Sequence, residues 1–269
     1  MRPPALTWGH TSTDRLAVGV KEVHAFVAKM VDMDPLDDHS SEQERIRSVY
    51  RDWLADERIS SYAWHREDVM EQDAARRRVA GALLARTLGP ELGKLRVVDV
   101  GCGSGGFLRQ LIDWGADPCR LAGTEYQEQR LVLARMRSAP GIHWHLGDLD
   151  FAEPGSFDLA VANTVFSSIL APDLRAALAR DMWRSVAPGG WCMLFDFRYN
   201  NPRNPNVRRV TRDELRRMWP GEESHYRSLL LAPPIARRLL GAPRIVAELL
   251  ATLAPPLRSH FIYMARKPA

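Results

Sequence analysis

The chain has 269 residues, of which 45% are hydrophobic and 26% charged, as is ordinary for a soluble protein with one large α/β domain. Its formal charge of +4 is a mild basic excess, and no basic-aromatic module accompanies it, so we expect no nucleic acid among its partners. Three widely spaced cysteines argue against a disulfide framework. Since neither a signal-peptide core nor a transmembrane segment is recognisable, we expect a cytoplasmic protein.

The first part of the chain is predicted to be helical. Apolar residues recur at helical spacing between residues 13 and 30, and again between residues 42 and 56. An aromatic-rich loop, "ISSYAWHRED" (59–68), leads into a helix over 69–88 that Gly89 and Pro90 terminate. We therefore expect a helical N-terminal cap over residues 1–68 and the main domain over residues 69–269.

From residue 95 onward, predicted strands and helices alternate. Strands are expected at 95–100, 120–125, 142–147, 157–163 and 191–197, with helices at 106–114, 127–137, 172–186 and from Thr211 to Met218. Two late strands, 225–232 and 258–266, flank an apolar helical insert at 233–256. Alternation of this kind predicts an α/β fold, with a parallel sheet covered by helices on both faces.

The stretch "VVDVGCGSGG" (97–106) places four glycines directly after a strand. Glycine loses more conformational entropy on folding than any other residue, so the cluster indicates a tight turn or a backbone lying close to a ligand. Gly101, Gly103 and Gly106 fit the dinucleotide fingerprint, whereas Gly101, Gly103 and Gly105 fit a GxGxG turn. The glycine spacing alone leaves the ligand open.

Acidic residues at the predicted strand ends favour one ligand. Asp99, just before the glycines, would repel a pyrophosphate but suits an amino-bearing ligand. Glu125 ends the next strand, where an acid can accept hydrogen bonds from both ribose hydroxyls. Asp148 follows the third strand, within reach of an adenine edge. About 95 residues precede the glycines and no catalytic domain follows them, which is unusual for a dehydrogenase.

Together these motifs resemble those of class I S-adenosylmethionine-dependent methyltransferases, over roughly residues 60–266. The similarity is most specific in "FDLAVANTVFSSI" and in "MWRSVAPGGWCMLFDF". It implies a Rossmann-like, doubly wound, seven-stranded sheet, mostly parallel with the last strand reversed. It also implies S-adenosylmethionine as cofactor and S-adenosylhomocysteine as product.

The resemblance also implies roles for individual residues. The cofactor-binding residues would be Tyr62, Asp99, Gly101, Cys102, Gly103, Gly105, Glu125, Tyr126, Asp148, Leu149 and Asn163. The glycines would approach the methionine part, Asp99 its amino group, and Glu125 the ribose. Asp148 and Leu149 would recognise adenine, and Asn163 would face the methyl group. For Tyr62, Tyr126 and Leu149, plain packing is an equal alternative.

The methyl acceptor is less well defined by the sequence. Asn163 is followed by Thr164 and Val165, not by the Pro-Pro-aromatic run of many exocyclic-amine methylases. We expect transfer to a hydroxyl, with an amine as second choice, of a small molecule or a glycan or secondary-metabolite intermediate. Candidate general bases are Asp196, His65 and His260. Their structural alternatives are a turn-capping acid, a solvated loop histidine and a core histidine.

Several features leave other interpretations open. We expect no metal, because "HWH" (143–145) supplies only paired histidines. The segment 203–217 holds six arginines against two acids, a solvated face or an anion-binding rim. The insert 233–256 is a lid, a dimer surface or a membrane-surface helix. The alternative functions are an NAD-dependent oxidoreductase and a non-catalytic binding or protein-interaction domain.

Overall fold

A computed structural model describes residues 42, 44–46, 48–49, 66–202, 204–221, 223–239, 241 and 244–269. The chain divides into two units, Met1–His39 and Ser40–Ala269, and the described residues all belong to the second. Among them, no helix has the length and apolar character needed to cross a membrane. Tyr62, His65 and most of the predicted N-terminal cap lie outside the described residues.

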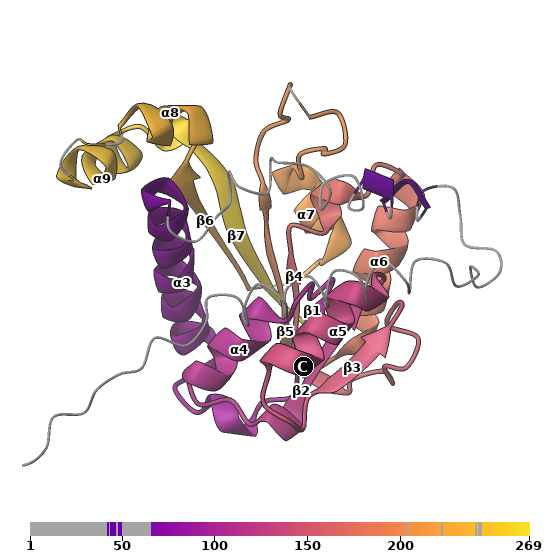
Figure 1. Cartoon of the computed structure of the whole chain (residues 1–269). Helices are drawn as coiled ribbons and strands as arrows, with labels where there is room; N and C mark the ends of the chain where they lie inside the picture. Colours follow the sequence, from indigo (N-terminus) through magenta and orange to yellow (C-terminus); the bar gives the residue numbers. More distant parts are fainter. Residues whose placement is uncertain are drawn as a thin grey trace, which may run out of the picture. The chain divides into compact units, whose positions relative to one another are not determined.

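A seven-stranded sheet in the order β3-β2-β1-β4-β5-β7-β6 forms the centre of the domain (Figure 1). Its strands are β1 (Val97–Val100), β2 (Leu121–Glu125), β3 (His143–Leu146), β4 (Phe157–Asn163), β5 (Val186–Phe197), β6 (Ser224–Leu231) and β7 (Arg258–Arg266). The first five strands pair in parallel, whereas β7 runs antiparallel to both β5 and β6. The predicted fold, with its reversed last strand, is confirmed.

Helices lie between the strands, as the alternating pattern predicts. They are α3 (Glu67–Leu88), α4 (Gly106–Asp113), α5 (Glu128–Arg137), α6 (Pro172–Ser185), α7 (Arg212–Met218), α8 (Pro233–Arg238) and α9 (Arg244–Leu253). Short 3₁₀ turns include η2 (Leu92–Lys94), η3 (Pro118–Arg120), η4 (Phe166–Ser168) and η5 (Pro255–Leu257). Helix α7 begins with a full capping box, in which Thr211 and Glu214 bond each other's backbone N–H groups.

Side chains that alternate along the strands divide the interior into two apolar cores. Val98, Ala160 and Leu194 point to the face covered by α6 and α7. Val97 and Val161 point to the opposite face, covered by α3 and α4. Because both faces of the sheet are covered, the central strands are almost wholly apolar, as buried parallel strands are.

Most predicted bounds differ from the observed ones by one or two residues, and two regions differ by more. Strand β5 starts at Val186, before the glycine pair, and its register with β4 shifts between Phe157 and Leu159, so the Pro-Gly-Gly segment is an irregularity inside the strand. The insert is two helices, α8 and α9, on either side of Gly241, whose φ is +85°. Figure 1 shows both helices near the N-terminal end of α3. There the Arg237 guanidinium of α8 lies 3.6 Å from the carboxylate of Asp68, in the first turn of α3.

Candidate functional site

A cavity opens at the carboxyl ends of β1, β2 and β4, where open parallel sheets bind their ligands. Strand-end residues form its polar side: Gly101, Thr124, Glu125, Tyr126, Asp148, Asn163 and Thr164. Apolar residues form much of the other side: Ile46, Val165, Ile169, Leu174, Ala177 and Leu178. The sheet topology thus brings together Gly101, Glu125, Tyr126, Asp148 and Asn163, all of which sequence reasoning selected.

The glycine turn after β1 has a backbone that only glycine adopts readily. Gly101, Gly103 and Gly105 have φ values of +64°, +57° and +77°. A Cβ at Gly101 would lie 2.6 Å from Val165 Cγ2, and one at Gly103 would lie 2.5 Å from Arg130 Nη2. The turn is therefore tight as well as strained for other residues, and it leaves the β1 end open beside the cavity.

Glu125 joins the glycine turn to the end of β2. It is 6% exposed, and its Oε2 accepts a hydrogen bond from the Gly103 N–H at 3.0 Å. Its Oε1 accepts one from the Gln127 N–H at 3.1 Å, and Arg130 Nη1 lies 3.6 Å from Oε2. Each carboxylate oxygen can accept a second hydrogen bond, so Glu125 retains capacity for two ligand hydroxyls.

Asp99 and Asn163 form a buried pair at the ends of β1 and β4. Asn163 Nδ2 donates to Asp99 Oδ1 at 3.3 Å, and Asp99 is only 2% exposed. Desolvation by burial raises the pKa of Asp99 to about 7. Asn163 Oδ1 is buried and unpaired within the described part of the chain, although Asn163 lines the cavity. An amino-bearing ligand would supply both the missing donor and a positive charge.

Of the remaining cofactor candidates, some line the cavity and others lie behind its lining. The Tyr126 hydroxyl donates to Asp148 Oδ1, which joins two of the predicted adenine-side residues. Leu149 is 1% exposed and belongs to the core beneath, as its packing alternative predicts. Cys102, Gly103 and Gly105 support the turn and do not line the cavity. Burial raises the pKa of the Cys102 thiol.

The structure does not bring the described catalytic candidates to the cavity. Asp196 is fully buried, and its two oxygens accept hydrogen bonds from the Ser167 N–H at 3.0 Å and the Phe197 N–H at 2.8 Å. His260 stacks on Phe195 at 5.1 Å between ring centroids, and burial lowers its pKa to about 4. These positions match the turn-capping and core alternatives. The catalytic role of either residue stays a prediction.

Some cavity residues were missed by sequence reasoning. Arg130 lies in the first turn of α5, five residues after Glu125. Leu174, Leu178 and Asp181 recur on one face of α6. That spacing is also the ordinary signature of a core-facing helix, so nothing in the sequence marks it as a ligand-facing one. No described residue of the insert 233–256 lines this cavity.

The paired histidines have structural partners. His143 and His145 both lie against Phe151, at 5.0 and 4.7 Å between ring centroids. His145 Nε2 is 2.8 Å from Asp150 Oδ1. Across the described ranges, no group of three or more His, Cys, Asp or Glu side chains could hold a metal ion.

Comparisons with known proteins show what the chain is similar to. Residues 97–190 match the family model described as a methyltransferase domain. A chain of the Haloferax volcanii complex between the Trm112 methyltransferase activator and a putative methyltransferase has 18% identity and a TM-score of 0.55, covering 87% of this chain and 100% of that one. A SAM-dependent methyltransferase from Archaeoglobus fulgidus has 15% identity and a TM-score of 0.51, covering 75% and 100%.

A third similar structure is that of Haemonchus contortus phosphoethanolamine N-methyltransferase 2 in complex with S-adenosyl-L-methionine, at 17% identity and a TM-score of 0.51. The match covers 71% of this chain but only 53% of that one. At such identities the structures show a shared fold, and no curated protein matches the chain. Residues 97–190 thus match a methyltransferase domain, and the seven-stranded sheet has the fold of the S-adenosylmethionine-dependent methyltransferases to which it is similar.

Proposed function

We propose that this protein transfers the methyl group of S-adenosylmethionine to a hydroxyl of a small molecule or a glycan intermediate, with an amine as the alternative acceptor. The observation that carries the proposal is the polar side of the cavity, where Glu125 ends β2, Asp148 follows β3 and Asn163 ends β4. The bound cofactor supplies a sulfonium whose methyl group is already activated for displacement. The protein has to bind, orient and desolvate the reactants.

The polar side of the cavity suits an adenosyl-amino-acid ligand. Glu125 would accept hydrogen bonds from the ribose hydroxyls through its remaining acceptor capacity. The unpaired Asn163 Oδ1, which lines the cavity, would receive the ammonium group, while Asp99, which is bonded to Asn163 but does not line the cavity, would supply a compensating charge. Tyr126 and Asp148, which are joined to each other, would contact the adenine. A pyrophosphate would instead favour the neutral form of Asp99 and would leave Asn163 Oδ1 without a donor, which argues against a nicotinamide dinucleotide.

Positioning is proposed to be the main source of catalysis. Alignment of two reactants can supply an effective molarity on the order of 10⁵ M or more. A general base adds about 10²–10⁴-fold, and neither Asp196 nor His260 lines the cavity. The apolar side, with Ile169, Leu174 and Leu178, favours an acceptor that is partly apolar around its nucleophile.

The acceptor class is tested by methyl transfer from isotopically labelled S-adenosylmethionine to matched hydroxyl and amine panels. Label in an O-methyl product, with equimolar S-adenosylhomocysteine, supports the proposal. Label in amine products alone would replace the hydroxyl assignment with the alternative. Tight binding of S-adenosylhomocysteine without transfer to any compound of either panel would favour a binding-only role.

A further inference from the structure

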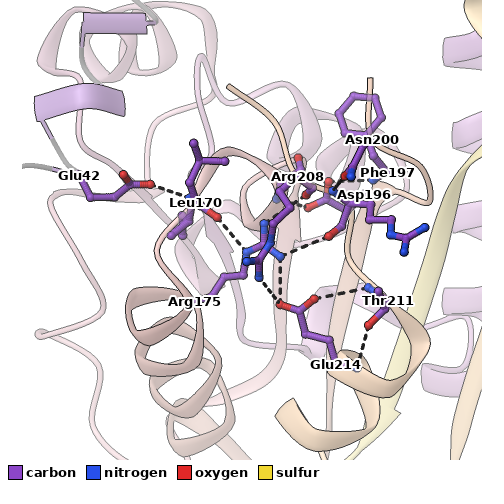
Figure 2. Close-up of polar contacts among 12 residues, drawn as sticks. Glu42, Leu170, Arg175, Asp196, Phe197, Asn200, Arg208, Thr211 and Glu214 are labelled. Atoms are coloured by element: carbon purple, nitrogen blue, oxygen red, sulfur yellow. Dashed lines mark hydrogen bonds and ion pairs between the residues drawn. The ribbon is translucent and has the colours of Figure 1, made fainter. Parts of the chain in front are cut away.

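The loop that follows β4 is fixed by side chains from distant parts of the chain. Arg45 Nη2 donates to the Ser168 carbonyl at 2.6 Å, and Arg175 Nε donates to the Ile169 carbonyl at 2.9 Å. The Leu170 N–H donates to Glu42 Oε1 at 2.6 Å. Three consecutive residues, 168–170, are thus each bonded through the backbone to a charged side chain, and Figure 2 shows Glu42 and Arg175 reaching this loop.

Two of these side chains come from the N-terminal part of the domain, and they also bind each other. Arg45 Nε lies 2.8 Å from Glu42 Oε2, and Arg45 Nη2 lies 2.9 Å from Glu42 Oε1. The Arg45 and Glu42 side chains are 26% and 13% exposed, so the pair is partly buried. The hydrogen bond from Arg45 lowers the pKa of Glu42, which keeps the carboxylate ionised. We call Glu42 and Arg45 the N-terminal clamp.

The third side chain, Arg175, anchors the same loop from the inside of the domain. It is 1% exposed, and its Nη1 donates to Glu214 Oε1 at 2.9 Å while its Nη2 donates to the Arg208 carbonyl at 3.1 Å. Figure 2 shows this network between α6 and the start of α7. The loop is therefore held on one side by the buried Arg175 and on the other by the N-terminal clamp.

The clamped loop is a wall of the candidate cofactor cavity. Ser168 and Ile169 both line it, and so does Ile46, which follows Arg45 in the chain. Ile46 is far from every strand of the sheet in sequence, so its place in the lining depends on contacts that hold its segment against the domain. Glu42 and Arg45 make such contacts, with the Leu170 N–H and the Ser168 carbonyl.

We propose that Glu42 and Arg45 are positioning residues for the cofactor site: they fix the Ser168–Leu170 wall, hold Ile46 against the cavity, and thereby slow the escape of bound cofactor. This inference rests on the proposed assignment of the cavity to the cofactor. It predicts that breaking the clamp changes the lifetime of the complex more than its rate of formation, because the clamp closes a wall and does not attract the ligand.

The test measures S-adenosylhomocysteine binding to the full chain, with association and dissociation rates from surface plasmon resonance. Glu42→Gln and Arg45→Met should each weaken binding about tenfold, mainly through faster dissociation, since each removes a charged hydrogen bond. The double variant should weaken binding by much less than the product of the single effects, because both residues act through one ion pair. Arg45→Lys should restore part of the affinity, and Ser48→Ala, an exposed neighbour, should change nothing.

A structural role alone would give a different pattern. In that case the variants would melt at lower temperature without ligand, yet bind S-adenosylhomocysteine within twofold of the wild type, and the proposal would be overturned. If a clamp variant does not fold, Ile46→Ala tests the same wall: unchanged dissociation would equally overturn the inference. Failure of the wild-type protein to bind S-adenosylhomocysteine would instead refute the assignment of the cavity, so the two failures are distinguishable.

Discussion

Asp99→Asn should make the ligand-free protein more stable while weakening its cofactor binding. Asp99 is buried at the end of β1, and desolvation raises its pKa from the usual 3.8 to about 7. The folded protein therefore binds a proton more tightly than the unfolded chain does. The contribution of this tighter proton binding at Asp99 to the free energy of unfolding is fully present below about pH 4 and is lost as the pH rises through about 7.

The size of this effect follows from the two pKa values. One pKa unit corresponds to about 1.4 kcal/mol, so a rise from 3.8 to about 7 corresponds to about 4 kcal/mol of lost stability above pH 7. Asparagine keeps the shape and the acceptor oxygen for Asn163 Nδ2 but carries no charge. The advantage of the variant should grow by about 2–3 kcal/mol between pH 5 and pH 8.

Urea unfolding of the wild type and of Asp99→Asn at pH 5 and pH 8 measures this difference in the free energy of unfolding. The buried groups Asp196 and His260 titrate in both proteins, so their contributions cancel in the difference. Asp158→Asn is a control of opposite sign: desolvation raises the pKa of Asp158, but hydrogen bonds from Arg96 lower it overall. That variant should lose stability at pH 8. The reasoning about Asp99 is refuted if its variant is less stable than the wild type at pH 8, or if the difference does not change with pH.

Three further substitutions test other parts of the structure. Gly103→Ala should lower the free energy of unfolding by about 1 kcal/mol because of its left-handed φ, and it should weaken S-adenosylhomocysteine binding by displacing Arg130. Gly89→Ala, at a φ of +79° with no atom nearby, should lower stability only. Equal effects of the two variants on binding would contradict this. Arg175→Met should cost about 3–5 kcal/mol in urea unfolding, because Glu214 would stay charged and partly buried, and a loss below 1 kcal/mol would count against the network. Asp196→Asn leaves one backbone N–H without its acceptor but also removes a carboxylate whose pKa burial raises to about 6, so its stability relative to the wild type should rise from pH 5 to pH 8. No change of this difference with pH would contradict the reasoning, and lost turnover at unchanged stability would support the catalytic assignment.

The order of strands and helices was predictable because each local signal agrees with the fold. Three kinds of local signal show this: the apolar runs, the Gly89-Pro90 stop and the capping box that begins at Thr211. Each involves only neighbouring residues, so it can be recognised in the sequence without knowledge of the fold. The cavity residues Glu125 and Asn163 were predictable for a related reason. In a parallel sheet the carboxyl ends of the strands meet at one edge, so residues at those ends must come together.

The features that were missed depend on contacts between distant segments. Arg45 lies 123 residues from Ser168, and Glu42 lies 128 residues from Leu170. Neither pair has a periodicity that a sequence window could detect. Asp196 is a candidate base in the sequence because it lies near the end of the fifth strand, at the ligand edge. Its complete burial and its two backbone N–H donors, from Ser167 and Phe197, depend on the fold around it.

The cofactor site is tested most directly by a calorimetric titration of the protein with S-adenosylmethionine, S-adenosylhomocysteine and NAD, repeated with Glu125→Ala. We expect micromolar binding of the two sulfur nucleosides, no binding of NAD, and loss of nucleoside binding in the variant, because Glu125 joins the glycine turn to the proposed ribose site. Undiminished nucleoside binding by Glu125→Ala, or binding of NAD alone, would contradict this expectation.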